Sequence, residues 1–426
     1  MCSIILCGSI KNDVMNLKNL ILTIVALFSV YLFYTSCQFN SSTDKNLSEM
    51  QSSVIVSPKK ETVMDSLRRP WSMAFITADE ALVAEKDGDL LKVNLKTKKK
   101  IIIQGFPNDL ADSLVVIAKD YPLGTYPTGL KGFKGRYNAG IFEVVLDPDF
   151  LSNQWVYISY VSEKEKKYAT KVIRAKLKNN QLTEIETILL ALPYADGLFH
   201  FGGGLLFGTD GKLYATIGER LFGDSLQPSF PIAQDLSDQR GKIYRINPDG
   251  TIPNDNPDFG DDAVAGLYAA GIRAAQGMTV DPRNGEIWFS EHGTNQGDEL
   301  NLLETGANYG WPIVSTGSYR GGYEPPKMDR DFTVPKWYWH HTVAPTGLTF
   351  YTGTEFPQWK NNLIVPGLSR GNFWRFVIED NVIQSVEELF IDERDRTRKA
   401  VQSPDGQLYI LTDEANGRII RIKNGQ

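Results

Sequence analysis

The chain alternates short apolar runs with turns of Gly, Pro, Asn and Asp from about residue 67 onward, and almost no segment repeats apolar residues at helical spacing. Strand-length apolar runs bounded by such turns are typical of all-β proteins. Residues 205–207 and 212–217 are one such pair of runs, and Thr209-Asp210-Gly211 lies between them. Asp-Gly between two apolar runs favours a tight β-hairpin. The pattern predicts an all-β domain over residues 65–426.

Some of these runs recur along the chain. One unit begins with a turn, continues with Leu or Ile, an aromatic residue and apolar residues, and leads to an acid, as in residues 210–219, 284–293 and 405–414. A second unit has Gly, a polar residue, two apolar residues, a base and a further apolar residue, in residues 88–93, 241–246 and 417–422. In the first and last copies the second unit follows the first, as a neighbouring strand of one sheet would.

Repeated four-stranded antiparallel sheets in one chain indicate a β-propeller more readily than a sandwich or a barrel. At ~45–60 residues per blade, a domain of ~360 residues predicts six blades, with seven as the alternative. Longer stretches interrupt the repeats at residues 108–137, 221–237 and 315–335. Long loops on a rigid repeat scaffold commonly build a binding face. We therefore expect one pocket in the funnel of the propeller.

The N-terminus has the pattern of an export signal. Lys18 precedes an apolar stretch over residues 20–34, and Thr35-Ser36-Cys37 follows it. A charged start, an apolar core and small residues before a cysteine favour a secretory signal, so residues 1–37 are interpreted as a signal peptide with a lipobox and a lipidated Cys37. An uncleaved membrane anchor is the alternative, although about 15 apolar residues are few for a span of ~20. The pattern predicts a protein exported and lipid-anchored to the bacterial cell envelope, in the periplasm or at the outer membrane.

Residues 38–64 are interpreted as a flexible tether, because Ser, Asn and Lys are frequent there and apolar periodicity is weak. All three cysteines, Cys2, Cys7 and Cys37, lie in the leader. The sequence of the exported domain therefore excludes disulfides, thiolate nucleophiles and thiolate metal sites. A net charge of -6 argues against nucleic acid as a partner.

Residues 199–220 carry the strongest candidate chemistry. His200 lies between two phenylalanines and precedes Gly202, Gly203 and Gly204. Successive glycines let a ligand or another chain segment approach the backbone closely. The alternative interpretation is a histidine packed at the base of a loop with no part in chemistry.

Several motifs resemble those of the soluble PQQ-dependent sugar dehydrogenases, the glucose/sorbosone dehydrogenase family that includes the aldose sugar dehydrogenases. The resemblance extends over roughly residues 71–423. Its motifs are HFGG with GTDGKLYATIG (200–218), AQDLSDQRGKIYRINPDGTIPNDNP (233–257), QGMTVDPRNGEIWFSEHG with GDELNLLETGANYGWP (276–312), TVAPTGLTFYTG (342–353) and residues 396–422. The resemblance implies a six-bladed propeller of four-stranded antiparallel sheets that oxidises aldose sugars to lactones by hydride transfer to PQQ.

The resemblance also implies roles for single residues. His200 would remove the proton of the sugar's anomeric hydroxyl, a task that suits an imidazole, and Arg273 would polarise the quinone carbonyl. Arg396 and Arg398 would hold PQQ carboxylates, since a planar guanidinium binds a carboxylate in bidentate fashion. A solvated, charge-rich loop is the alternative for this arginine pair. The further implied cofactor contacts are Asn138, Glu219, Gln276, Thr342 and Ser369.

Calcium is the second cofactor that the resemblance implies. One site would use the backbone carbonyls of Gly293 and Thr294, and another would use Glu299 and Tyr309. Oxygen ligands, including carbonyls, are what a hard cation requires. A surface turn acid is the alternative for Glu299. The expected partners are an aldose sugar, an external electron acceptor, the membrane through the lipid anchor, and a second copy of the chain in a homodimer.

Five positions depart from the family's pattern. Ala274 replaces a polar Asn, Ser369 a lysine, Gly204 an arginine and Glu143 a glycine, while Glu219 is one methylene longer than the usual Asp. These changes favour an alternative class, a calcium-stabilised propeller that binds a sugar or a protein without redox chemistry. Retention of the histidine and of three arginines favours the dehydrogenase, which is our interpretation.

Overall fold

The computed structural model describes residues 57–425 except 87, 112–114, 118–133, 137–138, 196–198, 221–230, 320–323, 370 and 394, and gives only the backbone course of 115–117 and 134–136. The predicted signal peptide, Cys37 and residues 38–56 of the predicted tether lie outside these residues. Within the described part of the chain, no helix is long and apolar enough to cross a membrane.

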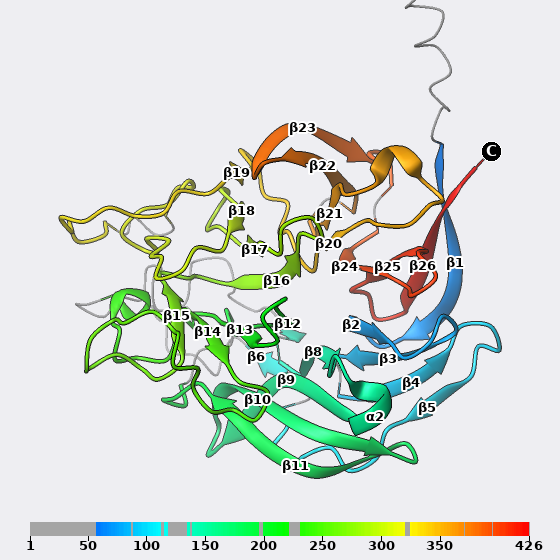
Figure 1. The fold of residues 1–426 in the computed structure, drawn as a ribbon, viewed down its shortest axis with the longest axis horizontal. Coiled ribbons are helices and arrows are strands. Elements are labelled where there is room, and N and C mark those ends of the chain that lie inside the picture. Colours follow the sequence, from blue (N-terminus) through cyan, green and yellow to red (C-terminus); the bar gives the residue numbers. More distant parts are fainter. Residues whose placement is uncertain are drawn as a thin grey trace, which may run out of the picture. The chain divides into compact units, whose positions relative to one another are not determined.

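Six four-stranded antiparallel sheets follow one another along the described chain (Figure 1). The inner strand of each sheet contacts the inner strands of its two neighbours, in the order β2, β8, β12, β16, β20, β24 and back to β2. Each sheet is therefore one blade of a closed ring. The prediction of a six-bladed β-propeller is confirmed, and the seven-bladed alternative is wrong.

The strands of the first three blades follow the chain from the inner strand outward. Blade 1 comprises β2 (Pro70–Phe75), β3 (Glu80–Glu85), β4 (Leu90–Asn94) and β5 (Lys100–Ile102). Blade 2 comprises β8 (Ile141–Leu146), β9 (Trp155–Lys164), β10 (Lys167–Lys178) and β11 (Gln181–Leu190). Blade 3 comprises β12 (Gly202–Phe207), β13 (Leu213–Ile217), β14 (Lys242–Ile246) and β15 (Leu267–Ala270).

The remaining blades also begin with the inner strand. Blade 4 comprises β16 (Ala275–Val280), β17 (Ile287–Glu291), β18 (Glu299–Leu302) and β19 (Trp337–Tyr338). Blade 5 comprises β20 (Thr349–Phe350), β21 (Leu363–Pro366), β22 (Phe373–Glu379) and β23 (Val382–Leu389). Blade 6 comprises β24 (Thr397–Gln402), β25 (Leu408–Thr412), β26 (Gly417–Asn424) and β1 (Pro58–Leu67). The other described elements are the hairpin β6–β7 (Val115–Ile117 and Lys134–Arg136), α2 (Phe150–Asn153) and the short 3-10 helices η2 (Ile232–Gln234) and η4 (Pro357–Trp359).

Blade 6 joins the two ends of the domain. β1 pairs antiparallel with β26, from Pro58 opposite Asn424 to Leu67 opposite Gly417, and the two strands lie side by side in Figure 1. The propeller therefore begins before the predicted boundary at residue 65. Its position explains the difference, because β1 is an outer strand with one neighbour and exposes much of its polar sequence.

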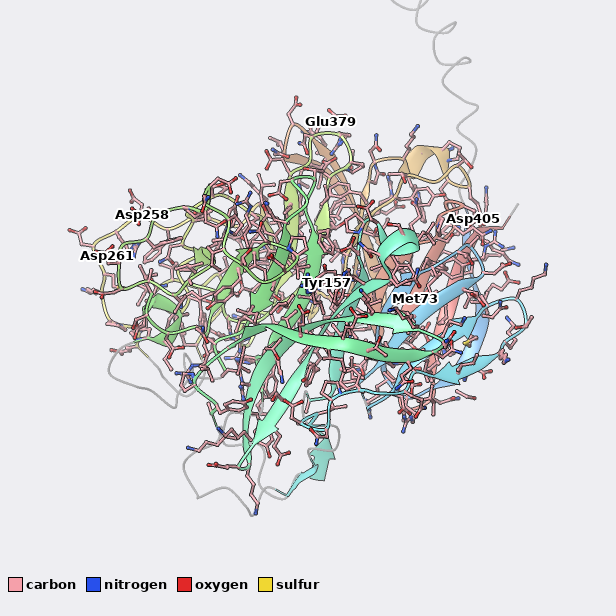
Figure 2. All side chains as sticks on the ribbon, turned by 60° about the horizontal axis from the view of Figure 1, so that its bottom comes forward. Met73, Tyr157, Asp258, Asp261, Glu379 and Asp405 are labelled. Carbon is pink, nitrogen blue, oxygen red and sulfur yellow. The ribbon has the colours of Figure 1, made fainter. Side chains whose placement is uncertain are left out.

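The core consists of apolar layers between neighbouring blades. One layer joins Tyr157 and Val172 of blade 2 to Leu205 and Tyr244 of blade 3. Tyr157 and Met73 belong to such layers, whereas Asp258 and Asp261 project from the outer edge (Figure 2).

Buried hydroxyl groups connect successive blades near the axis. Each belongs to the first or second strand of one blade and donates to a backbone carbonyl at the inner strand of the next blade, so it satisfies a polar group that has no ladder partner there. The pairs are Ser72 to Phe142 (2.8 Å), Ser159 to Gly203, Thr216 to Ala275 (3.1 Å) and Ser290 to Thr346 (2.8 Å).

An ion pair crosses the axis between inner strands. Lys399 of β24 donates to Glu143 of β8 over 2.7 Å, and the two strands belong to blades separated by blade 1. Glycine makes room for it: a Cβ on Gly347 would lie 2.2 Å from Cδ of Lys399. The Lys399–Glu143 pair therefore joins the inner strands of blades 6 and 2, and we call it the axial pair.

Candidate active site

The predicted site residues gather on one face of the propeller. This funnel face is formed by the loops that lead into the inner strands and by the loops between the second and third strands of each blade. Asn138 lies outside the described residues. The others on this face, in or next to these loops, are His200, Glu219, Arg273, Gln276, Gly293, Thr294, Glu299, Thr342, Ser369, Arg396 and Arg398.

His200 immediately precedes the inner strand of blade 3, and Glu219 follows the second strand of that blade. The predicted hairpin is present, with Phe207 of β12 opposite Leu213 of β13. Because the hairpin reverses the chain, His200 and Glu219 lie at the same end of the blade. Nδ1 of His200 is hydrogen-bonded to Oε1 of Glu219, whose side chain is 1% exposed. When Nδ1–H donates to the carboxylate, Nε2 is the basic nitrogen of the ring. The pair therefore has the form of an oriented general base.

The backbone holds His200 in a conformation that few side chains adopt. Its φ is +54°, in the left-handed region. The amide of Arg220 donates to the carbonyl of His200 over 3.2 Å, and a Cβ on Gly218 would lie 1.9 Å from the same carbonyl oxygen. Gly218 is thus required for this close approach. A strained residue that its surroundings fix in place is a feature of many functional sites.

Arg220 packs beside His200, and the sequence motifs do not single it out. It is 1% exposed, its guanidinium lies 3.8 Å from the ring centroid of Phe201, and it donates to the carbonyl of Tyr168 over 2.6 Å. The cation therefore packs against the residue that follows His200 and ties it to blade 2.

Arg273 lies next to this pair. The amide of Glu219 donates to the carbonyl of Arg273 over 2.9 Å. The guanidinium of Arg273 donates to the carbonyl of His292 over 3.1 Å and lies 5.1 Å from the ring centroid of Trp311. The side chain is nearly buried, at 3% exposure. Arg273 therefore brings a positive charge to the same part of the funnel as His200.

Four cations surround one buried carboxylate where blades 6 and 1 meet. Asp413 is 2.5 Å from Arg398, 3.4 Å from Lys86, 3.7 Å from Arg396 and 3.9 Å from Arg69. We call these five residues the cation cluster. Burial alone would raise the pKa of Asp413, but Arg398, Lys86 and Arg396 hold it below its usual value. Among the described residues, Arg398, Lys86 and Arg396 converge on this one carboxylate, so the cluster is suited to an anionic ligand.

Three further predicted cofactor contacts, Gln276, Ser369 and Thr342, lie close to the cation cluster or to the loop that follows His292. Arg398 donates to the side-chain oxygen of Gln276 over 3.0 Å. Arg396 donates to the carbonyl of Leu368 over 3.2 Å, next to the exposed Ser369. Thr342 donates to the carbonyl of Asn295, in the loop that also contains Gly293 and Thr294.

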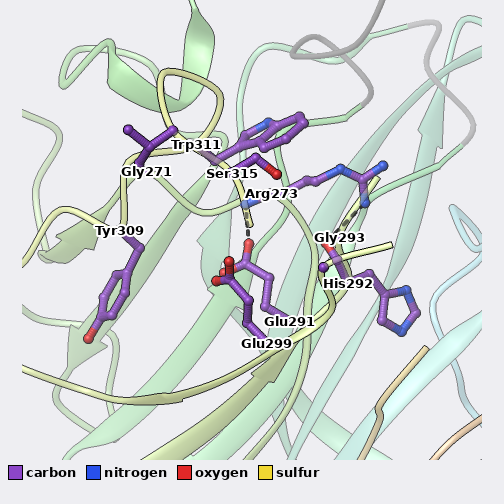
Figure 3. Close-up of a pocket in the computed structure, with 11 residues that line it drawn as sticks. Gly271, Arg273, Glu291, His292, Gly293, Glu299, Tyr309, Trp311 and Ser315 are labelled. Carbon is purple, nitrogen blue, oxygen red and sulfur yellow. Dashed lines mark hydrogen bonds between the residues drawn. The ribbon is translucent and has the colours of Figure 1, made fainter. Parts of the chain in front are cut away.

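Three of the four predicted metal residues, Gly293, Glu299 and Tyr309, line a small cavity beside Arg273, whereas Thr294 does not line it. Figure 3 shows the carboxylates of Glu291 and Glu299 facing each other in this cavity, with Tyr309 to one side. Its volume is about 20 Å³, enough for one small ion or water. Burial and the nearby Glu299 raise the pKa of Glu291 to about 8, and burial raises that of Glu299. Two buried acids that resist ionisation together are what a divalent cation would relieve.

The contacts of these residues limit what the metal site can contain. Glu299 accepts a hydrogen bond from Thr316 over 2.8 Å, Thr294 donates to the carbonyl of Ser318, and the hydroxyl of Tyr309 donates to the carbonyl of Leu302 over 2.6 Å. Among the described residues, no group of three or more His, Cys, Asp or Glu side chains is placed to hold a metal. A calcium ion here would depend on backbone carbonyls and water.

One signal in the sequence could have identified several residues that the motifs alone do not reveal. The recurring unit that leads to an acid ends its strand on the funnel face, and that acid is buried in four blades. In each case the acid binds a residue close to the start of the inner strand of its own blade. The pairs are Glu85 with Arg68, Glu219 with His200, Glu291 with Arg273, and Asp413 with Arg398. In the sequence, the end of the repeated unit therefore locates the acid, and the start of the inner strand of the same blade locates its partner.

Comparison with known proteins places this architecture in a family. The Glucose / Sorbosone dehydrogenase family profile matches residues 67–421. The chain is 28% identical to aldose sugar dehydrogenase YliI of Escherichia coli over 85% of this chain and 92% of that protein. It is 26% identical to quinoprotein glucose dehydrogenase B of Acinetobacter calcoaceticus, over 84% of this chain and 85% of that protein. The crystal structure of the soluble aldose sugar dehydrogenase from E. coli in its apo form superimposes with a TM-score of 0.74 at 28% identity, covering 86% of this chain and all of that one. The chain belongs to the glucose/sorbosone dehydrogenase family.

Proposed function

We propose that this protein oxidises aldose sugars to lactones at the funnel face, with PQQ as the bound oxidant. The single observation that carries the proposal is the His200–Glu219 pair, an oriented base that lies beside Arg273 and across from the cation cluster. The names of two relatives, an aldose sugar dehydrogenase and a quinoprotein, support the substrate and cofactor classes.

The donor set on the funnel face fits PQQ, which is a quinone with carboxylate groups. Among the described residues, Arg398, Arg396 and Lys86 share the carboxylate of Asp413, which suits this group of cations to the anionic groups of a ligand. When bound, PQQ would supply the oxidising power, as a quinone able to take up the hydride of the sugar, and an external acceptor would remove the electrons.

The residues of the chain supply the proton chemistry and the binding. Nε2 of His200 takes the proton of the anomeric hydroxyl, while Glu219 keeps Nδ1 protonated and stabilises the imidazolium that forms. Arg273 contributes a fixed positive charge toward negative charge that develops on the oxidant. The proton of the hydroxyl thus goes to His200, and the C1 hydrogen leaves with two electrons.

The experiment is a PQQ titration followed by turnover with an aldose and a soluble artificial acceptor. We expect the wild type to bind PQQ and turn over, and His200→Gln to bind PQQ while turnover falls by ~10²–10⁴, the usual worth of a positioned general base. If the folded wild type binds no PQQ, the alternative of a propeller that only binds a sugar or a protein replaces the dehydrogenase.

Calcium is proposed as the structural cation of the cavity between Glu291 and Glu299, with the carbonyls near Gly293, Thr294 and Tyr309 as further ligands. The proposal is supported by the raised pKa of both acids, since a divalent cation would let both ionise.

The cellular location is proposed from the N-terminal sequence alone. A lipidated Cys37 would anchor the exported domain to the bacterial envelope, and residues 38–57 would separate the propeller from the membrane. The external acceptor and a homodimer remain part of the proposal as expected partners.

A further inference from the structure

We propose that Lys86 is the third cation that holds the carboxylates of the bound cofactor, in place of the lysine that is absent at Ser369. The inference rests on the proposed function and adds to it a residue from a different blade. Lys86 follows β3 of blade 1, whereas Ser369 follows β21 of blade 5.

The position of Lys86 is fixed by both of its neighbouring blades. Its amide donates to the carbonyl of Arg69 over 3.0 Å. A Cβ on Gly140 would lie 1.5 Å from the carbonyl oxygen of Lys86, so blade 2 packs directly against its backbone. The ammonium lies 3.4 Å from Asp413 of blade 6, and the side chain is 8% exposed. Lys86 therefore enters the cation cluster from a rigid backbone at the junction of blades 6, 1 and 2.

Three other acids near the cation cluster, within the part of the chain that the structure describes, have partners of their own. Glu85 accepts from Arg68, Glu414 interacts with Arg418, and Asp395 interacts with Lys60 and Arg418. Asp413 is the described acid that Lys86 contacts together with Arg69, Arg396 and Arg398. Like charges this close in a buried site repel one another, and an anion between them relieves the repulsion.

The lowered pKa of Lys86 shows that the apo protein disfavours the charged form of this side chain. Burial lowers the pKa of Lys86 to about 8; Asp413 opposes the shift, and Arg398, Arg69 and Arg396 add to it. A lysine that served the fold alone would be stabilised in its charged form by its surroundings. A charged residue that the apo fold disfavours is instead typical of a functional site. There the charge lowers the stability of the folded protein but contributes to ligand binding.

The test compares PQQ binding and apo stability in the same variants. We expect Lys86→Met to weaken PQQ binding by about 10- to 100-fold in calorimetric titration, as for a lost charge-assisted hydrogen bond. The urea midpoint of the apo protein should stay the same or rise. Lys86→Arg should keep more affinity than Lys86→Met, since it keeps the charge.

Lys92→Met is the matched control, because Lys92 lies in the same blade and its ammonium is 3.7 Å from Glu80. It should leave the affinity for PQQ unchanged. If the wild type binds PQQ and Lys86→Met binds it equally well, Lys86 is not a cofactor residue and the proposed function is untouched. Loss of apo stability in Lys86→Met, with PQQ affinity that stays within a fewfold of wild type, would also overturn the inference, because it identifies a lysine that serves the fold. If the folded wild type binds no PQQ, the proposed function fails and the inference fails with it.

Discussion

The axial pair offers a direct test of how the inner strands of blades 2 and 6 are held together. The side chains of Lys399 and Glu143 are 11% and 2% exposed, so each would be an uncompensated charge without the other. Removing one partner of a buried ion pair costs about 3–5 kcal/mol. We therefore expect Lys399→Met and Glu143→Gln each to lower the free energy of unfolding by an amount in this range at pH 8.

The double variant Lys399→Met/Glu143→Gln should lose much less than the sum of the two single losses. It leaves no buried charge, and replacement of a buried pair by uncharged groups is often close to neutral. A coupling free energy of at least ~2 kcal/mol is expected, within the range for residues in contact.

The pH dependence should separate the two single variants. Burial raises the pKa of Glu143, and Lys399 opposes the shift, so Lys399→Met raises that pKa further. A carboxyl whose pKa is raised in the folded state destabilises the fold above its unfolded pKa, and the loss shrinks as the pH falls toward about 4.3, the ordinary pKa of Glu. The gain is at most about 1.4 kcal/mol per pH unit. Glu143→Gln leaves a buried ammonium, so acidification should bring no relief.

The assay is urea unfolding followed by circular dichroism at about pH 8 and about pH 5.5, with wild type as the reference at each pH. Additive losses in the double variant would show that the two charges do not depend on each other. A Lys399→Met loss that is as large at the lower pH as at the higher one would refute the assignment of Glu143 as the remaining buried charge.

The remaining predictions concern the general base, the cation cluster, the metal cavity and the lipid anchor. Glu219→Gln should reduce kcat by about 10²–10⁴ with little change in PQQ affinity, because the histidine loses its oriented tautomer; equal kcat would show that the contact has no part in turnover. PQQ affinity should fall as the pH rises above about 8, where Lys86 of the apo protein loses its charge, and Lys86→Met should flatten the profile in this range; a flat wild-type profile would contradict the charged role. Chelation should lower the melting temperature and calcium should restore it, since a ligand at a hundredfold excess over its Kd stabilises by about 2.7 kcal/mol; a melting curve indifferent to both would remove calcium. Cys37→Ser should abolish lipid modification and release or mislocalise the protein, and a mature wild-type chain that keeps its leader in intact-mass analysis would contradict the lipoprotein.

The architecture could be predicted from the sequence because the determinants of a propeller are local and repeated. The hairpin at Asp210-Gly211 and the pairing of β25 with β26 both arise from neighbouring segments. Most of β1 falls within the predicted tether because an outer strand with many polar residues carries no apolar run. Its partner strand lies at the far end of the chain, where no local pattern could indicate it.

The residues of the candidate site could be predicted only where they belong to a recognisable sequence motif. His200 and Glu219 are 19 residues apart and meet through one hairpin. Lys86 and Asp413 are 327 residues apart, and they meet only because the ring of blades closes. Without the structure, Lys86 looks like an ordinary turn lysine, and the lysine missing at Ser369 looks like an uncompensated loss.

The central claim is tested most directly by mixing PQQ-loaded protein with an excess of aldose, anaerobically and without an external acceptor, while the absorbance of the bound quinone is followed. The account predicts that the quinone absorbance disappears in a single turnover, with one lactone formed per bound PQQ. It also predicts that His200→Gln, loaded with PQQ to the same extent, reacts at least about 10²-fold more slowly. Bound PQQ whose spectrum does not change with any aldose, in folded wild-type protein, would contradict the claim that this funnel is the active site of a sugar dehydrogenase.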